Sequence, residues 1–199
     1  MSELTEFLDR TLASLCWTRC VLVGNSLGGL VAMDYALRHK DNVLGLVLVG
    51  SAGLQERSLT QGSKPRPTRE FVRSVVRDIF FDACMVTESL VDEWFELLQD
   101  RDYARFLLRL SRATRDRNVE SELSSLSMPT MLLWGRQDLI TPPDVAEQFR
   151  KRIPRSQLQY LDRCGHSPNL EQPQAFAKHL LEFLPGCFLA EHDVCARHI

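Results

Sequence analysis

The chain has 199 residues, which suits one domain or one domain with an inserted lobe. A formal net charge of −2 leaves no excess of basic residues for phosphates, so we expect no binding to nucleic acid. No apolar run approaches the roughly 20 residues that span a bilayer, so we also expect no membrane insertion.

The first residues and the cysteines favour a cytoplasmic protein. The start, MSELTE, is acidic and polar and lacks the basic and apolar regions of a signal peptide. The six cysteines are irregularly spaced and form no CxxC pair, which favours reduced thiols. His192, Cys195 and His198 match the spacing of zinc sites poorly. We predict no metal and no cofactor.

The first quarter of the chain alternates helical and strand patterns. Residues 2–15 predict an amphipathic helix, with Leu4, Phe7, Leu8, Leu12 and Leu15 on one face. Residues 20–23 predict a short strand, and residues 27–39 predict a helix. Residues 43–49, VLGLVLV, are apolar without alternation, which is typical of a parallel strand covered on both faces.

The middle of the chain predicts an all-helical insertion. Residues 55–68 read as a flexible linker, and helical patterns cover residues 70–81, a segment capped by Thr87 that ends at Gln99, and residues 102–113. We expect most of the aromatic side chains here to form the core of the insertion and some to line a pocket: Phe80, Phe81, Trp94 and Phe106.

After Pro129 the alternation returns. Strands are predicted at 130–134, where Trp134 should lie in the core of the sheet, and at 157–161. Between them, Thr141 should cap a helix with Pro142 at its first position and an end near Lys151. Residues 162–169 read as a loop, residues 173–184 as a helix, and residues 185–199 as a tail without clear period. This alternation predicts an α/β fold with a parallel sheet and helices on both faces.

Ser26, Asp138 and His166 each follow the carboxyl end of a predicted strand, where sites in such sheets lie. The sequence around the serine, GNSLG, fits the Gly-x-Ser-x-Gly nucleophile elbow. In this reading both glycines are needed because strand and helix come close, and the backbone N–H of Leu27 donates to an oxyanion. The alternative is that the glycines merely allow a strand to pack on a helix.

The other two residues would complete a catalytic triad. A serine needs a base within hydrogen-bond reach, and the base needs an orienting carboxylate. His166 lies in a glycine-containing loop, DRCGHSPNLEQP, unlike the histidines in helices or the tail. Asp138, in MLLWGRQD, is preferred to three other aspartates. Asp116 lies in the insertion, Asp144 lies at the start of a helix, and Asp162 is too close to His166 along the chain to support it from another strand. Cys164 is read as a small buried residue.

Three segments, GNSLGG, WGRQDLITPP and DRCGHSPNLEQPQAF, together resemble the α/β-hydrolase fold, in the branch of small esterases and carbon–carbon bond hydrolases. The likeness covers about residues 1–184. It implies a partial α/β-hydrolase fold with core parts at 1–54 and 128–184, an all-helical cap at 55–127 and a tail at 185–199. It also implies a serine hydrolase that works through an acyl-enzyme.

The expected substrates are small, mostly apolar carboxylic esters or related acyl compounds. A carbon–carbon bond hydrolase of vinylogous diketones is the nearest variant, although Ser167 stands where those enzymes tend to have a tryptophan. Haloalkane dehalogenases and epoxide hydrolases use an aspartate nucleophile, and position 26 is a serine.

One departure from the family concerns the region before the elbow. Family members carry further strands there and a loop that supplies a second oxyanion donor, so only Leu27 can be named. The strand at 20–23 would then be an apolar edge, which favours association into a homo-oligomer. We expect an incomplete hydrolase: a gene fragment, a misplaced start codon or a subunit completed by another chain. The alternative is an inactive remnant or interaction module.

Overall fold

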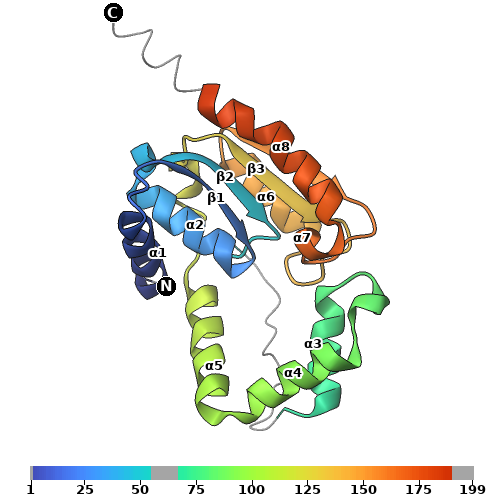
Figure 1. The fold of residues 1–199 in the computed structure, drawn as a ribbon. Helices are drawn as coiled ribbons and strands as arrows, with labels where there is room; N and C mark the ends of the chain where they lie inside the picture. Colours follow the sequence, from blue (N-terminus) through green and yellow to red (C-terminus); the bar gives the residue numbers. More distant parts are fainter. Residues whose placement is uncertain (1, 55–66, 190–199) are drawn as a thin grey trace, which may run out of the picture.

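The computed structural model describes residues 2–54 and 67–189 and contains a parallel sheet of four strands (Figure 1). The strands follow one another in chain order across the sheet: β1 (Cys20–Asn25), β2 (Val43–Val49), β3 (Thr130–Gly135) and β4 (Ser156–Leu161). Because all four run in parallel, their carboxyl ends meet at one edge of the sheet. The predicted α/β class is confirmed.

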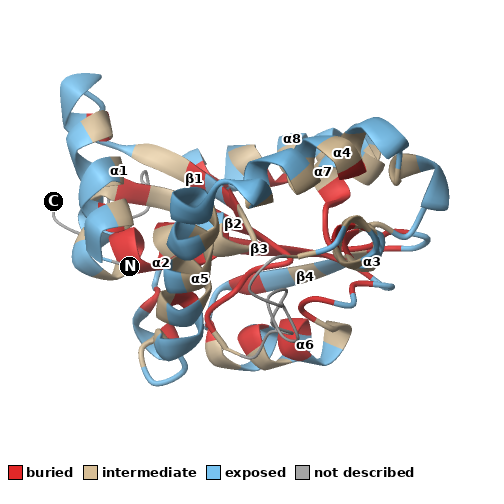
Figure 2. Cartoon of the chain, turned by 90° about the horizontal axis from the view of Figure 1, so that it is seen from below, coloured by how far each residue is buried: buried red, intermediate tan, exposed pale blue. Residues whose placement is uncertain are grey.

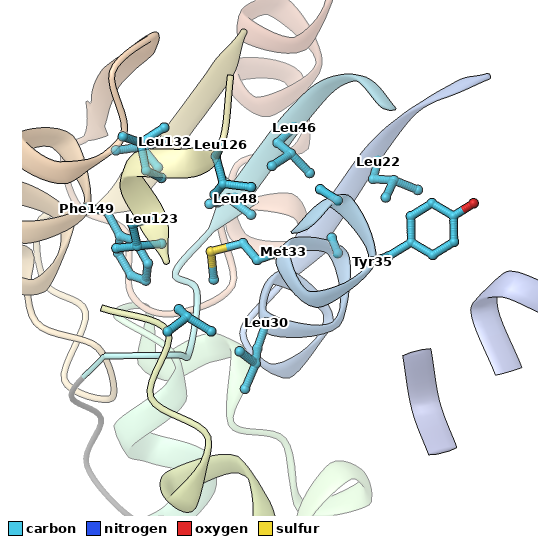
Figure 3. Close-up of a cluster of buried hydrophobic side chains, with 14 of the residues drawn as sticks. Leu22, Leu30, Met33, Tyr35, Leu46, Leu48, Leu123, Leu126, Leu132 and Phe149 are labelled. Atoms are coloured by element: carbon cyan, nitrogen blue, oxygen red, sulfur yellow. The ribbon is translucent and has the colours of Figure 1, made fainter. Parts of the chain in front are cut away.

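Helices cover both faces of the sheet. Alternate residues of β2 point to opposite sides: Leu46 and Leu48 join one apolar cluster, whereas Val47 and Val49 join the other. The first cluster includes side chains of α1 (Ser2–Ser14), α2 (Leu27–Arg38) and α6 (Pro143–Arg152), and Figure 3 shows its centre. The second lies against α8 (Pro173–Leu189). The apolar run of β2 is therefore buried on both sides, as predicted.

The prediction for Trp134 is confirmed. Its side chain is fully buried in the first cluster, where its ring lies 5.9 Å from that of Phe149. Its Nε1–H donates to the carbonyl oxygen of Thr141 over 2.7 Å, so the one polar atom of the indole is satisfied inside the core.

Three longer helices lie between β2 and β3, in the segment predicted to be a cap and called the cap below: α3 (Arg69–Ile79), α4 (Glu88–Gln99) and α5 (Arg101–Asp116). The hydroxyls of Thr68 and Thr87 accept from backbone N–H groups of the first turns of α3 and α4. The prediction that Thr87 is the N-cap residue of a helix is therefore confirmed. Single 3₁₀ turns occupy the short segments Lys40–Asn42, Ala83–Met85 and Leu123–Ser125.

The four aromatic residues that were singled out in this segment divide into two pairs. Phe80 and Trp94 pack against a small buried cluster of Val72, Val76 and Val91. Phe81 and Phe106 are exposed, so the expectation that most of these aromatics form the cap core holds for only half of them. Figure 1 shows the three helices following one another in an open arc beside the sheet, an arrangement that leaves such side chains uncovered.

The helix α1 buries less than its pattern predicts. Leu12 is buried, but Phe7 is 64% exposed and Leu15 is also exposed. Its main contacts in the described ranges are with α2, along one side of the helix. A sequence period indicates which face is apolar but not how much of that face is covered.

Three predicted boundaries are wrong. The side chain of Thr141 caps no helix because it binds Asp138, and α6 begins at Pro143 after Pro142. The segment read as a loop before Pro173 contains a short helix, α7 (Pro168–Glu171). The last helix continues through Pro185 to Leu189, because the buried side chains of Phe183 and Cys187 hold it against the sheet.

Some predictions fall on residues outside the described ranges, namely most of the linker at 55–68 and the group His192, Cys195 and His198. Within those ranges, no helix is both long and apolar enough to cross a bilayer. Five cysteines lie there, and all five are free thiols.

Candidate active site

Ser26 occupies a sharp turn between β1 and α2. Asn25, the last residue of β1, pairs with Val49, and the backbone N–H of Ser26 donates to the carbonyl oxygen of Val49 over 2.9 Å. The serine has φ 53° and ψ −119°, a conformation that non-glycine residues rarely adopt. Strain of this kind is what the elbow motif predicts.

Only one of the two glycines around Ser26 has the predicted role. A Cβ atom on Gly24 would overlap the backbone of Gly28, so β1 and α2 can cross here only because residue 24 has no side chain. A Cβ atom on Gly28 would meet no described atom within 4 Å, so the prediction that this position also requires a glycine for space is wrong. Gly29 has the second close contact, with the side chain of Ser51.

Asp138 and His166 form a buried pair beyond the ends of β3 and β4. The two side chains meet through His166 Nδ1 and Asp138 Oδ2 at 2.8 Å, and the residues are 4% and 2% exposed. The other carboxylate oxygen, Oδ1, accepts from the backbone N–H groups of Ile140 and Thr141 at 2.8 and 2.9 Å. These donors fix the carboxylate so that it orients the imidazole.

Thr141 and Gly50 complete the surroundings of the pair. The hydroxyl of Thr141 donates to Asp138 Oδ2 over 2.9 Å and lies 3.4 Å from His166 Nδ1. Gly50 has φ +47°, and a Cβ atom there would lie 3.0 Å from Asp138 Oδ2 and 3.1 Å from His166 Nδ1. The end of β2 can thus approach the pair only as a glycine.

The second ring nitrogen of His166 differs from the first in its surroundings. Its Nε2 is buried and has no hydrogen-bond partner among the described residues, so Ser26 does not hydrogen-bond to the imidazole in this conformation. Asn25, the neighbour of Ser26, reaches the same loop: its Nδ2 donates to the carbonyl oxygens of Val49 and His166, each over 3.0 Å. Hydrogen bonds of a triad often shorten only when substrate binds.

The rejected candidates have other surroundings. Asp162 pairs with Arg136 at 2.5 Å, Asp144 lies in the first turn of α6, and Asp116 ends α5. His39 stacks on Tyr35, and His179 lies 3.9 Å from Glu182. The structure therefore brings together the Asp138 and His166 chosen from the sequence.

The sequence analysis assigned no role at this site to three residues that contact it: Asn25, Thr141 and Glu171. Glu171 accepts hydrogen bonds from the backbone N–H groups of Gly165 and Ser167, on either side of His166. Asn25 lies inside the elbow motif, and Thr141 follows Asp138 by three positions, but neither spacing reveals which atoms meet.

Cys164 lies beside the site as a buried thiol. Burial, with a smaller contribution from the charges of Glu171 and Asp138, raises the pKa of Cys164 to about 12. A thiol held protonated in this way is a poor nucleophile, which agrees with its reading as a small buried residue. Within the described ranges, no group of three or more His, Cys, Asp or Glu side chains could hold a metal ion.

Curated relatives share this sequence at moderate identity. A 2-hydroxy-6-oxononadienedioate/2-hydroxy-6-oxononatrienedioate hydrolase of Comamonas testosteroni is 28% identical over 82% of the chain. A 2-hydroxymuconate semialdehyde hydrolase of Pseudomonas sp. (strain CF600) is 30% identical over 88% of it. The chain spans only 62% and 63% of the lengths of these two proteins.

Solved structures give the same picture. A meta-cleavage product hydrolase from Pseudomonas fluorescens is 25% identical, with a TM-score of 0.78, over 92% of this chain and 70% of its own. A bacterial membrane phospholipase A is 26% identical at the same TM-score, over 92% of this chain and 62% of its own. The model of the alpha/beta hydrolase family matches residues 1–179, and the chain belongs to that family.

Proposed function

We propose that this protein is a serine hydrolase that forms an acyl-enzyme on Ser26, with His166 as base and Asp138 as the orienting carboxylate. The observation that carries the proposal is the buried Asp138–His166 pair. Its Nε2 has no hydrogen-bond partner among the described residues, and its loop is bonded to Asn25, the neighbour of the strained Ser26. A buried polar atom without a partner is costly, and its retention next to a strained serine is typical of a catalytic site.

The mechanism follows from these roles. Ser26 Oγ attacks the acyl carbon while His166 Nε2 takes its proton, and Asp138 stabilises the imidazolium that results. The backbone N–H of Leu27, the first residue of α2, donates to the oxyanion, assisted by the positive end of the helix. His166 then returns the proton to the leaving group. In the second half, it activates water, which attacks the acyl-enzyme and releases the acid and Ser26. This chemistry requires no cofactor.

The proposed substrates are small, mostly apolar carboxylic esters or related acyl compounds. A second candidate is hydrolysis of a carbon–carbon bond in vinylogous diketones, because several relatives are named as hydrolases of such compounds. Ser167, directly after the base, argues for the ester reading, since we expect a tryptophan there in the carbon–carbon bond enzymes. A panel of short esters and one meta-cleavage product separates the two candidates.

A third candidate is an inactive protein or an interaction module. Within the described residues β1 is an edge strand, and its Val23 is 49% exposed. An apolar edge of this kind favours pairing with another chain, and we include a homo-oligomer through β1 in this candidate. It predicts a folded protein whose Ser26 does not react.

The deciding experiment is labelling with a fluorophosphonate, read by intact mass. The wild type should gain one adduct, Ser26→Ala should gain none, and Ser74→Ala should react like the wild type because Ser74 lies on the exposed side of α3. A wild type that melts cooperatively yet gains no adduct would overturn the hydrolase proposal and favour the inactive candidate. An adduct that persists in Ser26→Ala would assign the nucleophile elsewhere.

A further inference from the structure

The loop that carries His166 is attached to the cap at two points. The backbone N–H of His166 donates to the carbonyl oxygen of Ile79, the last residue of α3, over 2.7 Å. The backbone N–H of Phe81, two residues later, donates to Glu171 Oε2 over 2.8 Å. The segment that leaves α3 therefore lies directly against the residues around the proposed base.

Gly165 allows this close approach. A Cβ atom at this position would lie 2.6 Å from the carbonyl oxygen of Ile79 and 2.8 Å from the nitrogen of Phe81. Any side chain here would push the cap segment away from the loop. The guanidinium of Arg163 lies 5.7 Å from the ring centre of Phe81, which adds a further contact between the loop and the cap.

Glu171 joins the two segments through one carboxylate. Its Oε1 accepts from the N–H groups of Gly165 at 2.9 Å and Ser167 at 3.2 Å, while Oε2 accepts from Phe81 at 2.8 Å and, more weakly, from Gly165 at 3.1 Å. Two of these donors flank His166 and the third belongs to the cap. Both oxygens of a carboxylate accept, and hydrogen bonds to a charged acceptor are stronger than neutral ones, so a single side chain can hold all three.

We propose that Glu171 is a positioning residue that links the cap to the His166 loop, so that the position of the cap and the orientation of the imidazole change together. The proposal rests on the proposed function in naming His166 as the base. The link itself consists of hydrogen bonds from backbone N–H groups to the Glu171 carboxylate, and the exchange of these amide hydrogens can be measured without turnover.

The variant Glu171→Gln breaks this link while keeping the size of the side chain. A glutamine amide has one acceptor oxygen, and its NH₂ group donates. With its oxygen at the Oε1 position it cannot accept from Phe81. With its oxygen at the Oε2 position it cannot accept from Ser167 and keeps only the longer of the two contacts with Gly165. The matched control is Glu182→Gln on α8, whose exposed carboxylate has its recorded partner, His179, at 3.9 Å.

The measurements are amide hydrogen exchange by NMR and the resonance of the His166 Nδ1 proton. In Glu171→Gln, we expect exchange about tenfold or more faster at the amide of Phe81 or at that of Ser167, whichever loses its acceptor. We also expect a shifted or broadened Nδ1 proton signal, which a purely structural role for Glu171 would leave in place. Fluorophosphonate labelling of Ser26 should slow in parallel. The proposal is overturned if Glu171→Gln matches Glu182→Gln in the exchange rates and the proton signal.

Two further outcomes are covered. If Glu171→Gln does not fold, exchange in the wild type decides: the amides of Phe81 and His166 should open together, below the free energy of global unfolding, and unequal opening would refute the link. If wild-type Ser26 is never labelled, the proposed function fails, but the exchange rates and the Nδ1 proton still test the role of Glu171.

Discussion

The sheet core and the cap bury their apolar side chains to different extents (Figure 2). In the core, Leu46, Leu48 and Leu132 are fully buried because helices cover both faces of the sheet. The cap has a buried cluster of only three valines, and large apolar residues such as Leu97 and Phe106 remain exposed.

Ion pairs also join two helices of the cap. Arg69 binds Asp92 and Glu88, each at 2.6 Å, and Arg73 also binds Glu88. These pairs join α3 to α4 across an exposed surface, where they stabilise only weakly. The comparison indicates that the cap has only a small buried cluster of its own, so we expect substitutions of its exposed side chains to cost less stability than truncations in the sheet core.

The largest expected effect follows from breaking the pair in the core. Asp138→Asn places an NH₂ group near His166 Nδ1 and favours the wrong tautomer, so we expect labelling of Ser26 to slow by about 10⁴-fold. Rates of phosphonylation under pseudo-first-order conditions measure this loss. Asp162→Asn, which removes an exposed carboxylate outside the pair, is the control and should keep the wild-type rate. Equal rates in the two variants would contradict the role of Asp138.

A moderate effect is expected from truncating core and cap side chains. Leu132→Ala removes a fully buried side chain and should lower the free energy of unfolding by about 2–5 kcal/mol. Phe106 is 47% exposed, so Phe106→Ala should change that free energy by about 0.5 kcal/mol or less. Urea unfolding followed by circular dichroism measures both. Comparable losses of unfolding free energy in the two variants would show that Phe106 packs against more apolar surface than its exposure indicates.

The smallest effect concerns the pH dependence of the cap. Hydrogen bonds from Arg73 and then Arg69 lower the pKa of Glu88 from 4.5 to about 2. Since the pKa is lowered in the folded state, the stabilisation is fully present above about pH 4.5 and is lost as the pH falls toward 2. Hydrogen exchange of α3 and α4 between these pH values should reveal a small loss that added salt reduces.

Two variants test this assignment. Glu88→Gln should flatten the pH dependence of exchange in α3 and α4 because it removes the titrating carboxylate. Glu96→Gln, on the exposed face of α4, should retain the wild-type profile. An unchanged profile in Glu88→Gln would assign the effect to other groups.

Much of this arrangement was predictable from the sequence. The apolar run of β2, the strand pattern at 130–134 and the alternation of helices and strands predicted a parallel sheet, because burial on both faces requires apolar residues throughout a strand. Ser26, Asp138 and His166 were predictable for a related reason, since each follows a strand whose carboxyl end lies at the same edge of the sheet.

Other features depend on contacts that no local pattern encodes. Phe7 has the spacing of a core residue, but α1 packs on α2 along one side and Phe7 stays exposed. Leu15 follows the end of α1 and is also exposed. Thr141 is a residue type that often caps helices, but its hydroxyl donates to the carboxylate of Asp138 instead. Pro185 is a helix breaker by type, and yet the packing of Phe183 and Cys187 carries α8 past it.

The sequence by itself determined the fold class and the three residues of the proposed triad, because strand patterns and the residue types in the turns after them are local properties. The tertiary structure alone decided how those residues are held. Gly50 at the Asp138–His166 pair, Asn25 on the carbonyl of His166 and Glu171 between the loop and the cap come together from separate segments. Distances between such segments depend on how the chain packs, which residue type and spacing do not specify.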